Sequence, residues 1–140
     1  MELHGRDEGY YFLIEVPRDF SIHTIPEARK IINEAIGVGH KNFVFNLSVC
    51  NFMDSSSIGL VANFGKKCKS MGGQLVLMKP AKPIQELLSL TSMEEIVQIF
   101  ESHAELEKAL EEDKRVWAIG RATQEVAKKS QRLEDRPANE

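Results

Sequence analysis

Hydrophobic and polar positions divide the chain into alternating strand-like and helix-like segments. Apolar runs rich in β-branched and aromatic residues predict strands at 10–16, 42–47, 74–78 and 96–100, and residues 2–5 fit a short edge strand. Apolar residues at helical spacing predict helices over 26–37, from 54 to about 71, from Pro83 to about Thr91, and over 103–112. This alternation predicts an α/β fold with a single mixed, mostly parallel β-sheet flanked by helices.

The start of the first predicted helix has a recognisable signal. Pro17 ends the preceding strand, because proline cannot supply a ladder hydrogen bond, and residues 18–25 are predicted to form a loop. Thr24 offers a hydroxyl that can cap the helix, and Pro26 falls in the first turn, where a missing amide costs little. Gly72-Gly73 ends the second predicted helix and is interpreted as a turn.

The stretch from Phe52 to Gly59, FMDSSSIG, follows an apolar strand and opens a helix. One acid and three hydroxyls, from Asp54 to Ser57, therefore stand at the helix N-terminus. Capping explains one of them and contributes about 1 kcal/mol. A nucleophilic serine is disfavoured, because each serine lacks the glycine two positions earlier and no histidine–acid pairing is evident. A regulatory phosphosite is favoured instead, since a phosphate at a helix N-terminus meets free amides and adds charge to a docking surface.

A flank of the second helix is a candidate docking surface. Leu60 and Phe64 lie one turn apart, away from the apolar stripe through Ile58 and Val61, and Met53 precedes the acid. Leu60 and Phe64, together with Met71, are predicted to form an exposed apolar ridge, and Met53, Leu60 and Phe64 are predicted to bind a partner. The alternative is that a helix packed on a sheet buries a wide stripe that includes them.

Composition narrows the class of protein. The chain has 140 residues, 42% of them hydrophobic, and a net charge of −3, which indicates one soluble globular domain without a nucleic-acid-binding stripe. The longest apolar run is too short to span a bilayer, and the N-terminus lacks a signal-peptide layout. Cys50, Cys68 and the four histidines have no metal-ligand or redox spacing. We therefore expect a cytoplasmic protein with reduced thiols, no metal and no cofactor.

The C-terminal segment differs from the rest. Residues 113–140 contain many charged residues of both signs and a weak heptad repeat of apolar positions. They predict an extra C-terminal helix that frays to a disordered end, beyond a domain spanning residues 1–112. A homodimer through this helix is the alternative interpretation.

The order of strand, FMDSSSIG, helix, MGGQLVLMKPAKPIQELLSL and MEEIVQIF resembles the STAS domain of bacterial anti-sigma factor antagonists, over most of residues 8–112. The resemblance implies a mixed sheet flanked by helices and no catalysis. It also implies a serine directly after the aspartate, which an ATP-dependent anti-sigma factor serine kinase (a GHKL-type ATPase) phosphorylates and a PP2C-type phosphatase restores. That serine is Ser55, with Asp54 and Ser56 beside it. The unphosphorylated form captures the kinase and frees a sigma factor.

The sequence departs from the family pattern at two points near Ser55. Ser57 replaces the usual glycine after the second serine, and Ser21 stands where the family often has an acid, the nearest acid being Asp19. A constitutive STAS interaction subunit, for instance of a transporter ATPase, in which the serines only cap the helix, is the alternative function. A small serine hydrolase ranks third.

Overall fold

The computed structural model of the protein describes residues 3–109 and 111–112. The chain divides into two units, residues 1–101 and 102–140. In the second unit residues 103–109 and 111–112 are helical, as predicted, and the Glu105 amide donates to Ser102 Oγ at 3.1 Å. The predicted helix over residues 113–140, and the dimer through it, lie outside the described residues.

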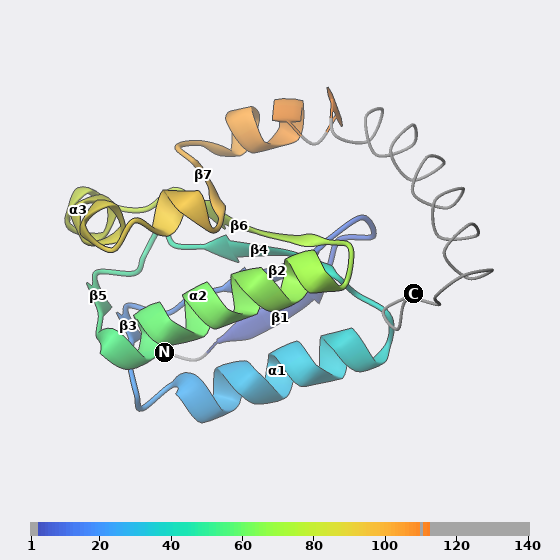
Figure 1. The fold of residues 1–140 in the computed structure, drawn as a ribbon, viewed down its shortest axis with the longest axis horizontal. Coiled ribbons are helices and arrows are strands. Elements are labelled where there is room, and N and C mark those ends of the chain that lie inside the picture. Colours follow the sequence, from blue (N-terminus) through green and yellow to red (C-terminus); the bar gives the residue numbers. More distant parts are fainter. Residues whose placement is uncertain (1–2, 110, 113–140) are drawn as a thin grey trace, which may run out of the picture. The chain divides into compact units, whose positions relative to one another are not determined.

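The first unit is built on a five-stranded sheet. Its strands are β1 (His4–Asp7), β2 (Phe12–Glu15), β4 (Asn42–Asn46), β6 (Gln74–Met78) and β7 (Gln98–Phe100). They lie in the order β1-β2-β4-β6-β7 (Figure 1). Only β1 and β2 pair antiparallel, and the other neighbours are parallel. This mixed, mostly parallel sheet confirms the predicted fold class.

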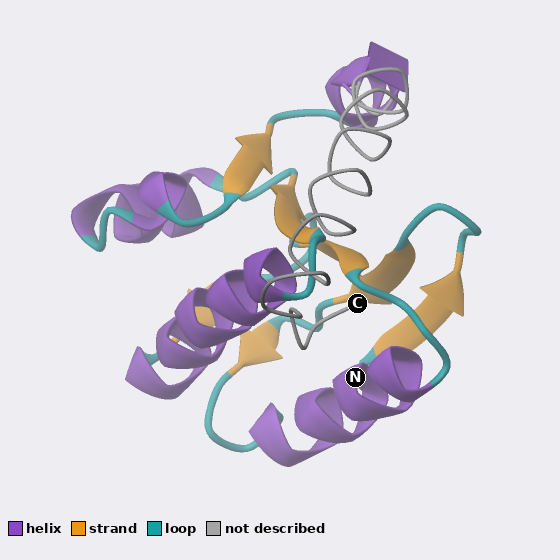
Figure 2. Cartoon of the chain, turned by 45° about the vertical axis from the view of Figure 1, so that its right-hand side comes forward, coloured by secondary structure: helices purple, strands orange, loops and turns teal. Residues whose placement is uncertain are grey.

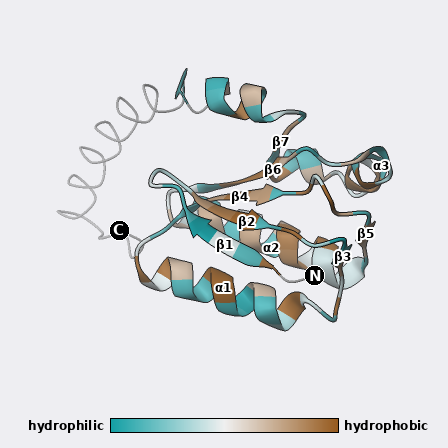
Figure 3. Cartoon of the chain, turned by 180° about the vertical axis from the view of Figure 1, so that it is seen from behind, coloured by the Kyte–Doolittle hydropathy of each residue, from teal (hydrophilic) through white to brown (hydrophobic). Residues whose placement is uncertain are grey.

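Helices connect the parallel strands, as crossover connections must. They are α1 (Ile25–Gly37), α2 (Ser55–Ser70) and α3 (Lys82–Leu90), followed by the short 3₁₀ helix η1 (Met93–Glu95). Figures 1 and 2 show α1 and α2 side by side along the sheet. Hydrophobic and hydrophilic bands alternate along α1 in Figure 3, because only one of its sides is buried.

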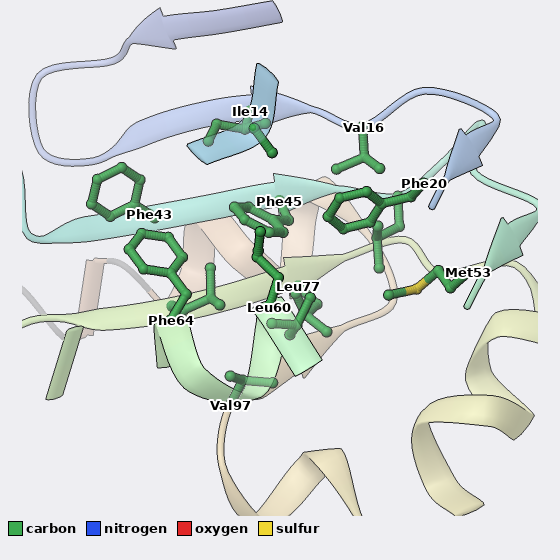
Figure 4. Packing of buried hydrophobic residues seen from close by; sticks show 14 of the residues in the cluster. Ile14, Val16, Phe20, Phe43, Phe45, Met53, Leu60, Phe64, Leu77 and Val97 are labelled. Atoms are coloured by element: carbon green, nitrogen blue, oxygen red, sulfur yellow. The ribbon is translucent and has the colours of Figure 1, made fainter. Parts of the chain in front are cut away.

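Aromatic rings fix α2 against the sheet. The ring centroid of Phe64 on α2 lies 4.7 Å from that of Phe43 and 5.9 Å from that of Phe45, both on β4. Phe45 in turn lies 6.2 Å from Phe20, edge to face (Figure 4). These tilted and edge-to-face arrangements suit the ring quadrupoles. They hold the body of α2 across β4 and so position its first turn.

The turn after α2 depends on two glycines, as predicted. Gly72 has a φ of +85°, which residues with a side chain rarely adopt. A Cβ on Gly73 would lie 1.9 Å from the carbonyl oxygen of Lys41. The backbone entering β6 therefore approaches the start of β4 more closely than any side chain allows.

Two short strands were missed in the sequence, one within residues 18–25, which were predicted to be a loop, and one just before Asp54. β3 (Asp19–Phe20) and β5 (Phe52–Met53) form a separate parallel pair, with Asp19 opposite Phe52 and Phe20 opposite Met53. Two residues are too few for a hydrophobic period to emerge. The predicted edge strand also starts later, at His4 instead of residue 2.

Within the part of the chain that the structure describes, no helix is long and apolar enough to cross a bilayer.

Candidate functional site

The candidate site lies where β5 leads into α2, beside β3 and the loop before α1 (Figure 1). Asp54, between β5 and α2, connects these segments through its two carboxylate oxygens. Oδ1 accepts a hydrogen bond from the Ser57 amide at 3.0 Å, and Oδ2 accepts one from the Ile22 amide at 3.0 Å. One side chain therefore joins the start of α2 to the loop that precedes α1.

Asp54 and Ser57 form a reciprocal cap. The Asp54 amide donates to Ser57 Oγ at 3.0 Å, and Ser57 Oγ donates to the Asp54 carbonyl at 3.0 Å. A capping box normally uses glutamate or glutamine at this position, and here serine serves instead. The predicted capping role of Asp54 is confirmed, and Ser57 is fully occupied by the same cap.

The carboxyl group of Asp54 carries a fixed negative charge at neutral pH. Hydrogen bonds from the backbone amides, first of Ser57 and then of Ile22, lower the pKa of Asp54 below its ordinary value. The candidate phosphosite therefore follows a residue that is already anionic.

The three serines differ in accessibility. Ser55 is exposed, Ser56 is half-buried, and Ser57 is completely buried. Since a kinase must reach the hydroxyl that it modifies, Ser55 is the most accessible acceptor of the three. This order could not be read from the sequence, where the three residues are equivalent.

The loop before α1 is held by Thr24, but not as predicted. Thr24 makes no side-chain cap bond to α1. Its hydroxyl accepts from the Ser21 amide at 3.0 Å and donates to the Ser21 carbonyl at 3.0 Å. The capping prediction was wrong because the backbone of Thr24 is near-helical (φ −103°, ψ −5°), whereas a capping residue is usually extended.

The two residues predicted beside the phosphosite from this loop have different surroundings. Ser21 is buried, and its Oγ accepts from the His23 amide at 3.3 Å. Asp19 is exposed on β3, opposite Phe52 and therefore near the entry to α2. The residue of this loop that bonds to Asp54 is Ile22, which the sequence had not singled out.

The predicted partner-binding residues Met53, Leu60 and Phe64 are buried, so the predicted exposed ridge through Leu60 and Phe64 is wrong. Their exposed fractions are 6%, 4% and 5%, and all three belong to the hydrophobic core. Figure 4 shows Leu60 and Phe64 directed from α2 toward Phe45 and Phe43. α2 contacts the sheet and α1 together, so it buries a wide arc of its surface, which was the alternative considered.

Two other apolar side chains lie exposed around Ser55. Ile22, in the loop that bonds to Asp54, is 60% exposed, and Phe52 on β5 is 49% exposed. Sequence reasoning missed them because hydrophobic residues in a short loop or a two-residue strand carry no periodic signal. Phe52, two positions before Asp54, was the one available indication.

A groove runs between α1 and α2 from the candidate phosphosite. Its first part is lined by Ile22 and Arg29 on one side and by Ser55, Ser56 and Asn63 on the other. An adjoining hollow shares Arg29 and Asn63 and continues to Lys67. We call these two hollows the α1–α2 groove. Leu60 lines both hollows and Phe64 the second, so these two buried residues contribute to its floor.

Neither a metal-binding cluster nor a reactive thiol is evident in the part of the chain that the structure describes. No group of three His, Cys, Asp or Glu side chains there is arranged to hold a metal ion. Cys50 and Cys68 are buried free thiols. Desolvation raises the pKa of both, that of Cys68 to about 12, so both stay protonated at neutral pH.

Comparison with known proteins agrees with this geometry. Residues 4–106 match the STAS domain family. The chain belongs to the STAS domain family. Candidate anti-sigma factor antagonists are among its relatives: one from Thermotoga maritima is 32% identical over 85 residues, which cover 61% of this chain and 73% of the relative. A homologue from Thermotoga neapolitana is 32% identical over 82 residues, covering 59% and 70%.

Solved structures share the fold of this STAS domain. A crystal structure of a candidate antagonist from Thermotoga maritima superposes with a TM-score of 0.70 at 24% identity, covering 76% of this chain and 92% of that one. The Bacillus cell fate determinant SpoIIAA, in its phosphorylated form, superposes with a TM-score of 0.62 at 18% identity, covering 77% and 98%. At these identities the likeness concerns the fold.

Proposed function

We propose that this STAS domain is an anti-sigma factor antagonist that acts by partner switching. In its unphosphorylated form it binds an anti-sigma factor serine kinase, a GHKL-type ATPase, and so releases a sigma factor for transcription. Phosphorylation of Ser55 ends the binding, and a PP2C-type phosphatase restores it. The protein acts in the cytoplasm and catalyses no reaction itself. Its relation to candidate anti-sigma factor antagonists supports this role.

The observation that carries the proposal is the separation of roles among neighbouring residues. Asp54 and Ser57 hold the start of α2 through the reciprocal cap, whereas the Ser55 side chain is exposed. A phosphate can therefore be added to Ser55 without breaking the bonds that begin the helix. The free amides and positive dipole end of α2 favour the added negative charge.

The surface around Ser55 suits a protein partner. Exposed Ile22 lines the groove with Ser55, and exposed Phe52 lies on β5, three positions before the serine. The Ile22 amide is bonded to Asp54, so this loop is held in place. Apolar side chains surrounded by polar groups are typical of the buried centre of an interface. We propose that Ile22 and Phe52 contact the kinase, in the role that the sequence had assigned to Leu60 and Phe64.

Electrostatics explain how one phosphate ends the contact. Phosphoserine adds about −1.5 to −2 charges at neutral pH, next to the anionic Asp54. In a closing interface this charge loses water without gaining a matched partner on the kinase. Each tenfold loss of affinity corresponds to about 1.4 kcal/mol, so a loss of about 3 to 4 kcal/mol is enough for release at cellular concentrations.

Phosphosite mapping tests this proposal. The full chain is incubated with its cognate kinase and ATP, beside Ser55→Ala and Ser56→Ala variants, and phosphate is located by mass spectrometry. We expect one phosphate, on Ser55, in the unmodified sequence and in Ser56→Ala, and none in Ser55→Ala. Phosphate on Ser56 alone, or on a residue away from α2, overturns the assignment.

A constitutive interaction subunit of the same fold, such as a partner of a transporter ATPase, is the second candidate. The complete burial of Ser57 in the cap favours it, because capping alone accounts for that hydroxyl. In this case Ser55→Asp leaves partner binding intact, whereas partner switching predicts its loss.

A further inference from the structure

Arg29 is a cationic side chain that shares the α1–α2 groove with the candidate phosphosite. It lines both hollows of the groove, and Ser55 lines the first of them. Arg29 is exposed, and among the described residues no carboxylate lies within ion-pair distance of it. An unpaired guanidinium therefore shares a groove with the serine that we propose is phosphorylated.

The acids near Ser55, Asp54 beside it and Asp19 opposite Phe52, cannot neutralise a phosphate. Asp54 is anionic, and its oxygens already accept hydrogen bonds from the Ser57 and Ile22 amides. The neutral Asn63 lines the groove between Arg29 and Ser55, and Lys67 lines only its far hollow. Among the described residues that line the first hollow with Ser55, Arg29 is thus the charged donor placed to meet a phosphate on Ser55.

We propose that Arg29 binds the phosphate of phosphorylated Ser55 within the same molecule, across the α1–α2 groove. A guanidinium presents a planar set of donors that matches phosphate oxygens, often as two parallel hydrogen bonds. The inference rests on the proposed function only in taking Ser55 as the modified residue.

This contact would change the shape of the docking face as well as its charge. It draws the phosphate over the groove and occupies Arg29, so the phosphorylated face differs from the unmodified one in shape as well as in charge. It also offsets part of the repulsion between the phosphate and Asp54.

The test measures the second ionisation of the phosphate directly. The full chain is made with phosphoserine incorporated genetically at position 55, which requires no kinase, and its ³¹P resonance is titrated. Arg29→Gln is compared with Lys30→Gln, a matched control that removes one positive charge from the next exposed residue of α1, which does not line the groove. All proteins carry His23→Gln, which removes the imidazole in the loop before α1 from the titration.

We expect Arg29→Gln to raise the second pKa of the phosphate by about 0.2 to 0.7 unit from its value near 6, the range for an exposed ion pair. Lys30→Gln should change the second pKa of the phosphate by less than half of the shift that Arg29→Gln causes. In 1 M salt the difference between the two variants should disappear. Equal shifts in the two variants, or none in Arg29→Gln, overturn the proposal. No kinase is involved in this titration, so a result that overturns the Arg29 contact does not overturn the partner-switching proposal. Conversely, the contact between Arg29 and phosphoserine 55 can be measured even if no kinase phosphorylates Ser55.

Discussion

Asp54 and Ser57 bind each other across the first turn of α2 in both directions. The Ser57 amide donates to Asp54 Oδ1 and the Asp54 amide donates to Ser57 Oγ, each at 3.0 Å. This pair begins the helix without any contribution from Ser55. The stability of the helix start and the candidate switch therefore rest on different side chains, and substitution can separate them.

Replacing Ser57 with alanine should destabilise the protein. The part-buried Asp54 amide would lose its acceptor, and losing such a hydrogen bond typically costs about 0.5 to 1.5 kcal/mol. Ser56→Ala, at the half-buried position next to it, should change the free energy of unfolding by less than about 0.5 kcal/mol. Urea unfolding measures both values. Equal effects of the two substitutions would show that the cap does not stabilise α2.

Asp54 should make the stability of the protein depend on pH in acid. Its pKa in the folded state is lowered by the Ser57 and Ile22 amides, so its stabilising effect is complete above the unfolded value of about 3.9. The effect is lost as the pH falls through the lower, folded-state pKa. The variant Asp54→Asn cannot ionise and lacks this dependence.

The difference in unfolding free energy between the unmodified protein and Asp54→Asn should therefore stay constant from about pH 7 to 5 and shrink below about pH 4. Urea unfolding at several pH values measures it. Asp7, whose pKa the Gly9 amide and His40 also lower, is present in both proteins and cancels. A difference that stays constant through acid would contradict the amide contacts of Asp54.

Core and surface hydrophobic residues near the site should respond in opposite ways. Phe64→Ala removes a buried ring that contacts Phe43 and Phe45, and should cost about 3 to 5 kcal/mol of stability. Ile22→Ser alters a side chain that is 60% exposed, so the free energy of unfolding should change by less than about 0.5 kcal/mol.

Ile22→Ser should nevertheless weaken binding of the kinase by tenfold or more, because truncating a central contact typically costs over 1 kcal/mol. Leu90→Ser is the matched control, since Leu90 is 84% exposed and lies on α3, which contributes no residue to the α1–α2 groove. Isothermal calorimetry with the purified kinase compares them. If Ile22→Ser and Leu90→Ser bind equally well, Ile22 is not part of the interface.

The sequence predicted the fold closely because the sheet strands carry dense apolar patterns and the helices carry clear periods. The run from Asn42 to Leu47 is an example, since β4 spans Asn42–Asn46 at the centre of the sheet. Helix spacing alone could not show that α2 contacts both the sheet and α1. Leu60 and Phe64 were therefore assigned to the surface although they lie in the core.

The candidate site was predicted only in part, because its contacts join distant segments. The bond between Ile22 and Asp54 spans 32 positions, and the groove that unites Arg29 with Ser55 requires the packing of two helices. Capping by Asp54 was predictable from residue type and position. The burial of Ser57 in the cap was not predictable, since it depends on which of the three hydroxyls points toward the core.

The two cysteines should be unreactive in the folded protein. Both thiols are buried and protonated at neutral pH, and the pKa of Cys68 is raised to about 12 by desolvation. Iodoacetamide at pH 8 should leave Cys50 and Cys68 unmodified by mass spectrometry, and should label both in urea. Rapid labelling of Cys68 without denaturant would contradict its burial.

A pull-down from the source organism tests the central claim, that Ser55 controls partner binding, most directly. Unmodified protein, Ser55→Ala and Ser55→Asp are used as bait under identical conditions, and captured proteins are identified by mass spectrometry. We predict that unmodified protein and Ser55→Ala retain a protein with a GHKL-type kinase domain and that Ser55→Asp does not. Equal retention of one partner by all three proteins would contradict the switch.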